Sequence, residues 1–476
     1  MWGGFVNNRA FLVTILILFV VSIGFVVGFS NKNYEKIETN SNNIETEKGS
    51  NMENSDKLTI QNNNEQSEIN ENDPNKMEED EVIIPWQESM PKAIKAVYST
   101  GWVMGTPSLR KAMINSVKEN GFNAIVVDIK DESGQLTYDS EVQTAIDIKS
   151  SQKMVKDIKS VIDELKENDI FVIGRIVTFK DPIFASKVEG VAYQNQDGSI
   201  WHDYSGRCWP NPYNEKSWEY PIALAKEAAE LGFQEIQFDY IRFPSSEGRV
   251  KNIAYGFDSD TKSKADVICA FLEKVKEELT DYNVPISADV FGITTKRDGD
   301  FEHIGQDFAR ISFIVDIVCP MVYPSHYANN EYKIARPDKD PYAIIKYSMI
   351  DAMNRLESYY IKEKNLENID EEIADEEGIS EKENIELKSG EEITETSKEI
   401  NIRANNQEIL REYGVKIRPY LQDFTASWLG KGNYLVYGDE EVKVQIQAAY
   451  DLGIDDFCLW DPSNKYCYGA LNKINK

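Results

Sequence analysis

The chain has 476 residues and a formal net charge of −29, with 81 acidic against 52 basic side chains. Proteins bind nucleic acids and anionic lipid surfaces through clustered Lys and Arg, so this charge argues against either as the main partner. The five cysteines form no C-x-x-C pair and show no metal-ligand spacing, which argues against a thiolate metal site.

Residues 11–29 form an apolar segment without a charged side chain, and Arg9 precedes it. About 20 apolar residues are enough to cross a bilayer. We expect residues 1–30 to be a single-pass anchor in the cell membrane with a cytoplasmic N-terminus, so that the remaining chain is extracellular. A cleaved signal peptide, with secretion, is the alternative, although the run is long for an h-region and no A-x-A site follows it.

Residues 31–82 are rich in Asn and Glu and contain no aromatic residue after Tyr34. Such a tract cannot bury enough apolar surface to offset the entropy of ordering it. We therefore predict a disordered linker, and we expect the chain without residues 1–82 to be a soluble, cooperatively folding domain.

Eight short apolar segments follow in residues 83–476, most of them separated by a helix-length stretch. Continuous β-branched runs suit strands that are buried on both faces, and strands alternating with helices predict parallel βα units. Eight such units make a (β/α)8 TIM barrel, an α/β fold, the most economical interpretation. The predicted strands are 94–100, 122–130, 170–179, 233–243, 285–292, 315–324, 416–424 and 456–462.

Several connections between these strands stand out. Residues 180–216 and 325–340 are long loops of the kind that set specificity in barrels. Residues 361–405 are strongly acidic and interrupt the pattern before the seventh strand. We expect this stretch to be a charged helical or disordered insertion at the surface.

Polar and aromatic residues occupy one parity near the end of each predicted strand, while the opposite parity is apolar. Because alternate residues of a strand face opposite sides, the polar set is predicted to face the barrel interior. Active sites of such barrels lie at the carboxyl ends of the strands. The strand-end candidates are Asp128, Lys130, Arg175, Asp239, Asp289, Tyr323, Gln422 and Trp460.

The motifs that the sequence lacks narrow the chemistry. It has three histidines (His202, His303 and His326) and no G-x-S-x-G, H-E-x-x-H, G-x-G-x-x-G or P-loop pattern. A nucleophilic triad, a catalytic metal and a nucleotide cofactor are therefore not expected, and activity should survive EDTA. A structural Ca²⁺ remains open around Asp197 and Asp203 in the long loop.

A pair of carboxylates among aromatic and basic residues is the equipment of glycoside hydrolysis, which leaves Asp239 and Asp289 as the catalytic candidates. A carboxyl separation of ~5–5.5 Å would favour retention and one of ~6.5–9.5 Å inversion. Asp239 could instead be a structural partner of Arg175 or Arg242. Candidate substrate-binding residues are Trp102, Asp128, Lys130, Arg175, Arg242, Tyr323, His326, Gln422 and Trp460.

The strand-end motifs also resemble a known family. VDIKDESG, IGRIVTFKDP, FDYIRFP, ISADVFG, VCPMVYPSHY, IRPYLQDF and LWDPSN occur in this order between residues 127 and 464. They are similar to a bacterial family of glycoside-hydrolase-like proteins catalogued as DUF4015, and the resemblance covers about 90–470. It implies a TIM barrel of glycosidase type, and it leaves the substrate open.

Two functions are consistent with these patterns. The first is an envelope-tethered glycoside hydrolase that acts on an extracellular or cell-wall polysaccharide. The second is a catalytically silent barrel that binds glycans from the membrane. Both require aromatic side chains at the strand ends, and only the enzyme requires two carboxylates with one pKa raised.

Overall fold

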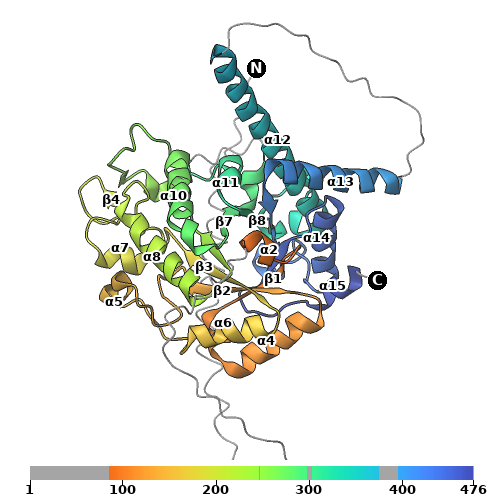
Figure 1. Cartoon of the computed structure of the whole chain (residues 1–476), viewed down its shortest axis with the longest axis horizontal. Coiled ribbons are helices and arrows are strands. Elements are labelled where there is room, and N and C mark those ends of the chain that lie inside the picture. Colours follow the sequence, from red (N-terminus) through yellow and green to blue (C-terminus); the bar gives the residue numbers. More distant parts are fainter. Residues whose placement is uncertain (1–84, 246, 297–302, 375–394, 475–476) are drawn as a thin grey trace, which may run out of the picture.

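The computed structural model describes residues 85–245, 247–296, 303–374 and 395–474. Within these ranges the chain forms a barrel of parallel strands surrounded by helices (Figure 1). The predicted anchor and linker, residues 1–82, lie outside the described residues. None of the helices that the structure describes is both long and apolar enough to cross a membrane.

The barrel strands match the eight predicted segments. The strand order is β10-β11-β1-β2-β3-β5-β7-β8-β9, and a further β10–β8 pairing closes the barrel. All pairings in this sheet are parallel. The strands are β1 (Lys95–Ser99), β2 (Ala124–Lys130), β3 (Phe171–Val177), β5 (Glu235–Asp239), β7 (Ile286–Phe291), β8 (Ile317–Met321), β9 (Lys416–Ile417), β10 (Tyr420–Gln422) and β11 (Phe457–Trp460).

The seventh predicted strand is split into β9 and β10 at Pro419. Proline has no N–H to donate to a neighbouring strand, so the ladder is interrupted at this point. The neighbours still hold the segment in place, because Arg418 N donates to Val318 O at 2.9 Å and Cys458 N donates to Pro419 O at 3.0 Å.

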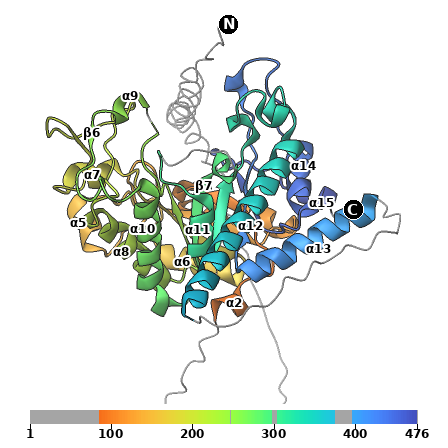
Figure 2. The same cartoon turned by 90° about the horizontal axis from the view of Figure 1, so that it is seen from above.

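Helices cover the outside of the barrel (Figure 2). Helix α6 begins after Asp157, whose side chain accepts a hydrogen bond from Ser160 N, and α10 begins with a capping box between Ser263 and Asp266. The main helices are α4 (Pro107–Glu119), α6 (Ile158–Glu167), α8 (Lys216–Leu231), α10 (Lys264–Glu278), α11 (Phe308–Ile314), α12 (Pro341–Ala374), α13 (Glu395–Tyr413), α14 (Asp439–Asp451) and α15 (Gly469–Ile474).

Shorter elements fill the connections. They are α2 (Trp86–Ser89), α3 (Gly101–Gly105), α5 (Gln143–Ile148), α7 (Pro182–Lys187) and α9 (Glu247–Val250), the small antiparallel pair β4 (Gln194–Asn195) and β6 (Ile253–Ala254), and six single-turn 3₁₀ segments. The 3₁₀ segments are η1 (Thr280–Tyr282), η2 (Gly292–Thr295), η3 (Pro324–His326), η4 (Glu331–Lys333), η5 (Pro337–Lys339) and η6 (Ser427–Leu429).

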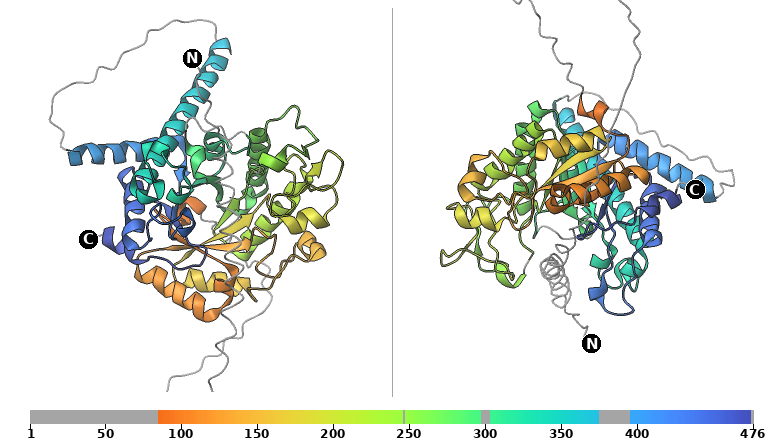
Figure 3. Two further views of the ribbon diagram at one scale, coloured as in Figure 1. Left: turned by 180° about the vertical axis from the view of Figure 1, so that it is seen from behind. Right: turned by 90° about the horizontal axis from the view of Figure 1, so that it is seen from below.

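The acidic stretch is helical at both of its ends. Helix α12 runs through residues 361–374 and α13 begins at residue 395, while residues 375–394 lie outside the described residues. The two helices diverge from one side of the barrel (Figure 3). Arg403 of α13 forms an ion pair with Asp455, which attaches α13 to the segment before β11.

Two apolar clusters confirm the predicted alternation along the strands. The cluster between strands and helices contains the apolar parity, including Val127, Phe238 and Val290. The cluster inside the barrel contains the opposite parity, including Tyr98 and Tyr420. The strands that carry the strand-end polar residues are therefore packed on both faces, and this packing fixes the positions of those residues.

Candidate active site at the carboxyl ends of the strands

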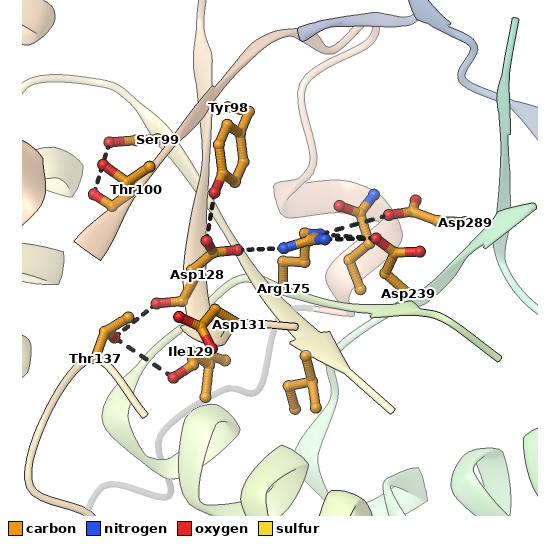
Figure 4. Close-up of polar contacts among 12 residues, drawn as sticks. Tyr98, Ser99, Thr100, Asp128, Ile129, Asp131, Thr137, Arg175, Asp239 and Asp289 are labelled. Atoms are coloured by element: carbon orange, nitrogen blue, oxygen red, sulfur yellow. Dashed lines mark hydrogen bonds and ion pairs between the residues drawn. The ribbon is translucent and has the colours of Figure 1, made fainter. Parts of the chain in front are cut away.

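Four ionisable side chains from four neighbouring strands meet at the carboxyl ends of β2, β3, β5 and β7 (Figure 4). Arg175 lies at the centre. Its Nη1 is 2.6 Å from Asp128 Oδ1, its Nη2 is 2.5 Å from Asp239 Oδ2, and its Nε is 4.0 Å from Asp289 Oδ2. All four residues are at most 5% exposed. We call them the rim cluster.

The local backbone explains how these side chains converge. Asp128 pairs with Arg175 across β2 and β3, and the register shifts between Asp128 and Lys130. Thr137 Oγ1 donates to the Asp128 carbonyl at 2.6 Å and supports the chain at this bulge. On β3, Gly174 lies where a Cβ would come within 2.5 Å of Ile129 Cδ1, so a larger residue would force the neighbouring side chains to shift.

Asp239 is fixed by the residue that follows it. Tyr240 has a φ of 52°, in the left-handed region that is sparsely populated by non-glycine residues. In this conformation Tyr240 N donates to Asp239 Oδ1 at 2.6 Å, while Asp239 Oδ2 receives Arg175 Nε at 3.1 Å. Both carboxylate oxygens of Asp239 therefore have donors, an arrangement suited to a charged carboxylate.

Asp289 has a different environment. Its side chain is 2% exposed, and Oδ1 has no hydrogen-bond partner among the described residues. Burial, followed by the negative charge of Asp239, raises the pKa of Asp289 well above its ordinary value, and Arg175 and Arg418 oppose this shift. Burial and the charge of Asp239 both favour the protonated form of Asp289 over the charged form.

Asp128 and Tyr98 complete the polar centre. Burial raises the pKa of Asp128 to about 6 against the lowering effect of Arg175. Tyr98 Oη donates to Asp128 Oδ2. Burial alone would lower the pKa of Arg175, but Asp128 and Asp239 raise it well above its ordinary value, so the guanidinium stays charged.

Aromatic side chains surround the rim cluster. The rings of Tyr98 and Trp460 are 4.1 Å apart, and the Arg175 guanidinium carbon is 5.7 Å and 5.5 Å from their centroids. Tyr323 follows β8, and its ring is 5.3 Å from His326. Burial, followed by the neighbouring Asp289, raises the pKa of Tyr323 above its ordinary value.

Beyond Tyr323, a cavity of about 190 Å³ lies between the loops that follow β8 and β10. Trp428 lines it and stacks on Phe424 with ring centroids 5.7 Å apart. His326 contacts both rings, and burial lowers its pKa to about 4, so His326 is neutral at pH 7. Its position at the strand ends agrees with the sequence prediction.

Two predicted substrate contacts need correction. Lys130 is fully buried, and its Nζ lies 2.7 Å from Asp181 Oδ2. The bulge after Asp128 aligns Lys130 with Ile176, whose side chain belongs to the cluster outside the barrel, so the simple alternation fails by one residue. Lys130 therefore faces the helix layer, where its Nζ lies 4.7 Å from the Tyr220 ring.

Gln422 is the second correction. Its side chain is fully buried, its Oε1 accepts from Ser325 N at 3.0 Å, and its Nε2 donates to Asp338 Oδ1 at 2.9 Å and to Phe424 O at 3.0 Å. The amide joins the loop after β8 to the loop after β10, and both of its N–H groups are already donated within the protein.

The other predicted contacts are placed as follows. Trp102 lies in α3 directly after β1 and is 61% exposed, outside the rim cluster. Arg242 is buried against the rings of Trp209, Tyr240 and Phe291 and forms no ion pair with Asp239 among the described residues. The structural pairing considered for Asp239 therefore involves Arg175.

Tyr98, Glu132 and Lys180 are not among the residues predicted from the sequence. Tyr98 lies at the inward parity one residue before the end of β1, so the same strand-end rule could have found it. Lys180 lies in the loop after β3, and its Nζ contacts Tyr240 Oη at 3.2 Å. Lys180 and Arg175 lower the pKa of Glu132 against the effect of burial. Such contacts between loops leave no periodic signal in a sequence.

The described residues contain no group of three or more His, Cys, Asp or Glu side chains that could hold a metal ion. The carboxylates considered for Ca²⁺ are engaged in local turns. Asp197 Oδ1 accepts from Ser199 N at 3.0 Å, and Asp203 Oδ2 accepts from Trp209 Nε1 at 3.1 Å. All five cysteines are unpaired thiols.

A closed (β/α)8 barrel with a carboxylate–arginine cluster at its carboxyl end defines an enzyme-like TIM barrel. The chain matches the DUF4015 family, described as "Putative glycosyl hydrolase domain", over residues 96–366 and 377–466. It belongs to this family, as the strand-end motifs predicted. The unmatched residues 367–376 fall within the acidic insertion.

The chain is similar to parts of solved structures. A hypothetical protein from Ruminiclostridium thermocellum ATCC 27405 is 38% identical, with a TM-score of 0.38, over 41% of this chain and 97% of its own. The PgaB (BpsB) glycoside hydrolase domain from Bordetella bronchiseptica is 11% identical, with a TM-score of 0.50, over 80% of this chain and 98% of its own. The second likeness supports the fold. No curated protein matches the chain.

Proposed function

We propose that this protein is a glycoside hydrolase that cleaves an extracellular or cell-wall polysaccharide with Asp239 and Asp289. The observation that carries the proposal is the contrast between these two carboxyl groups on neighbouring strands. Asp239 has donors on both oxygens, whereas Asp289 is buried with one oxygen unpartnered among the described residues and has a raised pKa. One charged and one protonated carboxyl are the pair that glycosidic cleavage requires.

In this mechanism Asp289 is the acid. Its proton moves to the glycosidic oxygen as the bond between that oxygen and the anomeric carbon breaks. Asp239 acts on the opposite side of the sugar, either by attacking the anomeric carbon or by accepting a proton from the water that attacks it. In the first case water then displaces Asp239 from the anomeric carbon and gives a proton to Asp289. In the second case water supplies the new hydroxyl group directly, and the proton on Asp239 later returns to Asp289 through solvent.

Neighbouring side chains support these roles. Arg175 positions Asp239 through two nitrogens, at 2.5 Å and 3.1 Å, and it also holds Asp128. Trp460 and Tyr323 offer apolar faces to the C–H surface of a sugar ring, and the cavity lined by Trp428 has room for a neighbouring residue of the glycan.

Membrane attachment is part of the proposal. Residues 11–29 are uncharged and apolar, and residues 31–82 are long enough to separate the barrel from a bilayer. The barrel would then act outside the cell while it stays attached. Protease added to intact cells should release the barrel, and release only after cell lysis would contradict this placement.

The function is tested by incubating the full-length protein with a panel of cell-wall and capsular polysaccharides and measuring new reducing ends. Asp239→Asn and Asp289→Asn should lose this activity while both still bind the glycan. Asp163→Asn, on the outer helix α6, is the matched control and should keep it. Binding without new reducing ends in the unaltered protein would instead identify a glycan-binding barrel.

A further inference from the structure

A second group of charged residues lies beside Asp239. Tyr240, the next residue, is held in a left-handed conformation, and such strain is often found at functional sites. Its ring contacts two cations. Lys180 Nζ is 4.5 Å from the Tyr240 ring centroid, and the Arg242 guanidinium carbon is 5.0 Å from the same centroid. Both cations therefore contact the residue that directly follows the proposed catalytic carboxylate.

Lys180 and Arg242 differ from the other buried cations. Five Lys and Arg side chains are buried in the part of the chain that the structure describes, namely Lys130, Arg175, Lys180, Arg242 and Arg418. Lys130 pairs with Asp181, Arg175 with Asp128 and Asp239, and Arg418 with Glu235. Lys180 and Arg242 have no carboxylate oxygen within 4.0 Å among the same residues.

Arg242 has the clearest unused bonding capacity. It is 5% exposed, and its Nη1 donates to Phe243 O at 3.0 Å. Its Nε has no acceptor among the described residues. Three rings surround the guanidinium, with Phe291 nearest at 4.6 Å. Burial lowers the pKa of Arg242, and Tyr240 and Asp239 oppose this shift.

A buried cation without an anion is costly, because water no longer stabilises the charge. The nearby acidic residue Glu132 does not remove this cost. Lys180, Arg175 and Arg207 lower its pKa, yet it forms no ion pair with them within 4.0 Å. Two unpaired cations next to a catalytic carboxylate are explained if an anion of the substrate binds between them.

We propose that the substrate is an anionic glycan, and that Arg242 and Lys180 bind the carboxylate of a sugar residue at the cleavage site. The inference rests on the proposed function and names its substrate class. A guanidinium recognises a carboxylate through a charged fork of N–H groups, which a neutral hydroxyl or amide cannot match. The carboxylate could belong to a uronic acid or to a lactyl ether of an amino sugar.

The experiment measures binding of matched oligosaccharide pairs to the full-length protein by calorimetry. One pair contains glucuronic acid and its methylamide, and the other contains muramic acid, free of peptide, and its methylamide. All measurements use the Asp289→Asn variant as the background, so that the glycan is not cleaved during the experiment. We expect the carboxylated member of one pair to bind about 10- to 100-fold more tightly than its amide, and the pair that discriminates identifies the source of the carboxylate.

Arg242→Met added to this background should abolish the preference and leave the affinity for the amide unchanged. It should not lower the melting temperature, because an apolar side chain of similar size replaces a buried unpaired charge. Lys180→Met is the second variant, with the same expectation. Arg411→Met, on the outer helix α13, is the matched control.

Two outcomes would overturn the inference. One is equal binding of acid and amide in both pairs. The other is a fall in melting temperature for Arg242→Met with equal weakening for both members, which would make Arg242 a packing residue. Tight binding of the carboxylated glycan by the unaltered protein without any cleavage would overturn the proposed function and support the binding site.

Discussion

Strand β5 carries a buried acidic residue at each end, and the two ends differ in how their charge is balanced. At the start of the strand, Glu235 receives both terminal nitrogens of Arg418, at 2.7 Å and 2.9 Å, and Ser287 Oγ at 2.6 Å. At the end of the strand, Arg175 is shared by Asp239, Asp128 and Asp289. We call Glu235, Arg418 and Ser287 the floor cluster.

This difference indicates that the floor cluster serves stability and the rim cluster serves chemistry. The floor cluster matches one carboxylate with one guanidinium at zero exposure, so it has no unused acidic oxygen to offer a substrate. The rim cluster has three carboxyl groups for one guanidinium, and burial raises the pKa of two of them, Asp128 and Asp289. An excess of carboxyl groups is unfavourable for folding alone, and it supplies the proton and the charge that cleavage requires.

The largest expected effect concerns the two proposed roles in the rim cluster. Asp239→Asn should lower kcat roughly 10²- to 10⁴-fold on any substrate that the protein cleaves. Asp289→Asn should do the same on a polysaccharide but lose much less on an aryl glycoside with an acidic leaving group, because that group departs without a proton. Initial rates on both substrates give the comparison, and equal losses for the two variants would contradict the assignment.

The floor cluster should respond in stability. Glu235→Gln leaves Arg418 buried without an anion, and we expect it to lower the free energy of unfolding by about 3–5 kcal/mol. Replacing both residues, as Glu235→Gln with Arg418→Met, should recover much of the loss. Denaturant unfolding measures both. A variant that unfolds like the unaltered protein would show that the floor pair contributes nothing beyond its own desolvation cost.

A third carboxyl tests whether a raised pKa by itself indicates function. Asp423, after β10, is buried with Oδ1 unpartnered among the described residues, and burial raises its pKa from 3.8 to about 7. Its folded pKa lies above the unfolded value, so the folded state binds the proton more tightly. Its contribution to stability is present below pH 3.8 and is lost as the pH rises through about 7.

Asp423→Asn removes this titration. The difference in unfolding free energy between the unaltered protein and the variant should therefore change between pH 4 and 8, by roughly 4 kcal/mol at most. Catalytic activity should be retained, because Asp423 Oδ2 accepts from Cys467 N at 2.8 Å and has no contact with Arg175. A variant with a flat difference across this range, or without activity, would contradict the reading of Asp423 as a structural carboxyl.

The fold could be predicted from the sequence because each barrel strand is a local signal. Runs such as AIVVDIK, the residues of β2, are apolar on both faces, and their repetition with helices between them specifies parallel units. The rim residues Asp128, Arg175, Asp239 and Asp289 followed from the same rule, since the carboxyl ends of parallel strands meet at one end of a barrel.

The errors arose where the local rule fails. Lys130 was assigned to the interior by alternation, and a single bulge moved it to the helix layer. Gln422 has the expected inward position, but its amide is taken up by Asp338 and Ser325, which lie far away in sequence. Lys180 meets Tyr240 only because two loops fold toward each other. Such contacts depend on tertiary structure, which periodicity does not encode.

The smallest expected effect compares two tryptophans at the strand ends. Trp460 packs on Tyr98 at 4.1 Å and lies over Arg175, whereas Trp102 is 61% exposed. If Trp102 stacks on a distal sugar residue, Trp102→Ala should raise KM for a long glycan by a few-fold, corresponding to ~0.5–1.5 kcal/mol, and leave kcat unchanged. The melting temperature should stay the same, since an exposed side chain contributes little to folding. The KM for a disaccharide substrate is the control, because a contact with a distal sugar residue should affect only the long glycan. A loss of kcat for both substrates would place Trp102 in the rim cluster with Trp460, and unchanged kinetics for both would remove it from the binding surface.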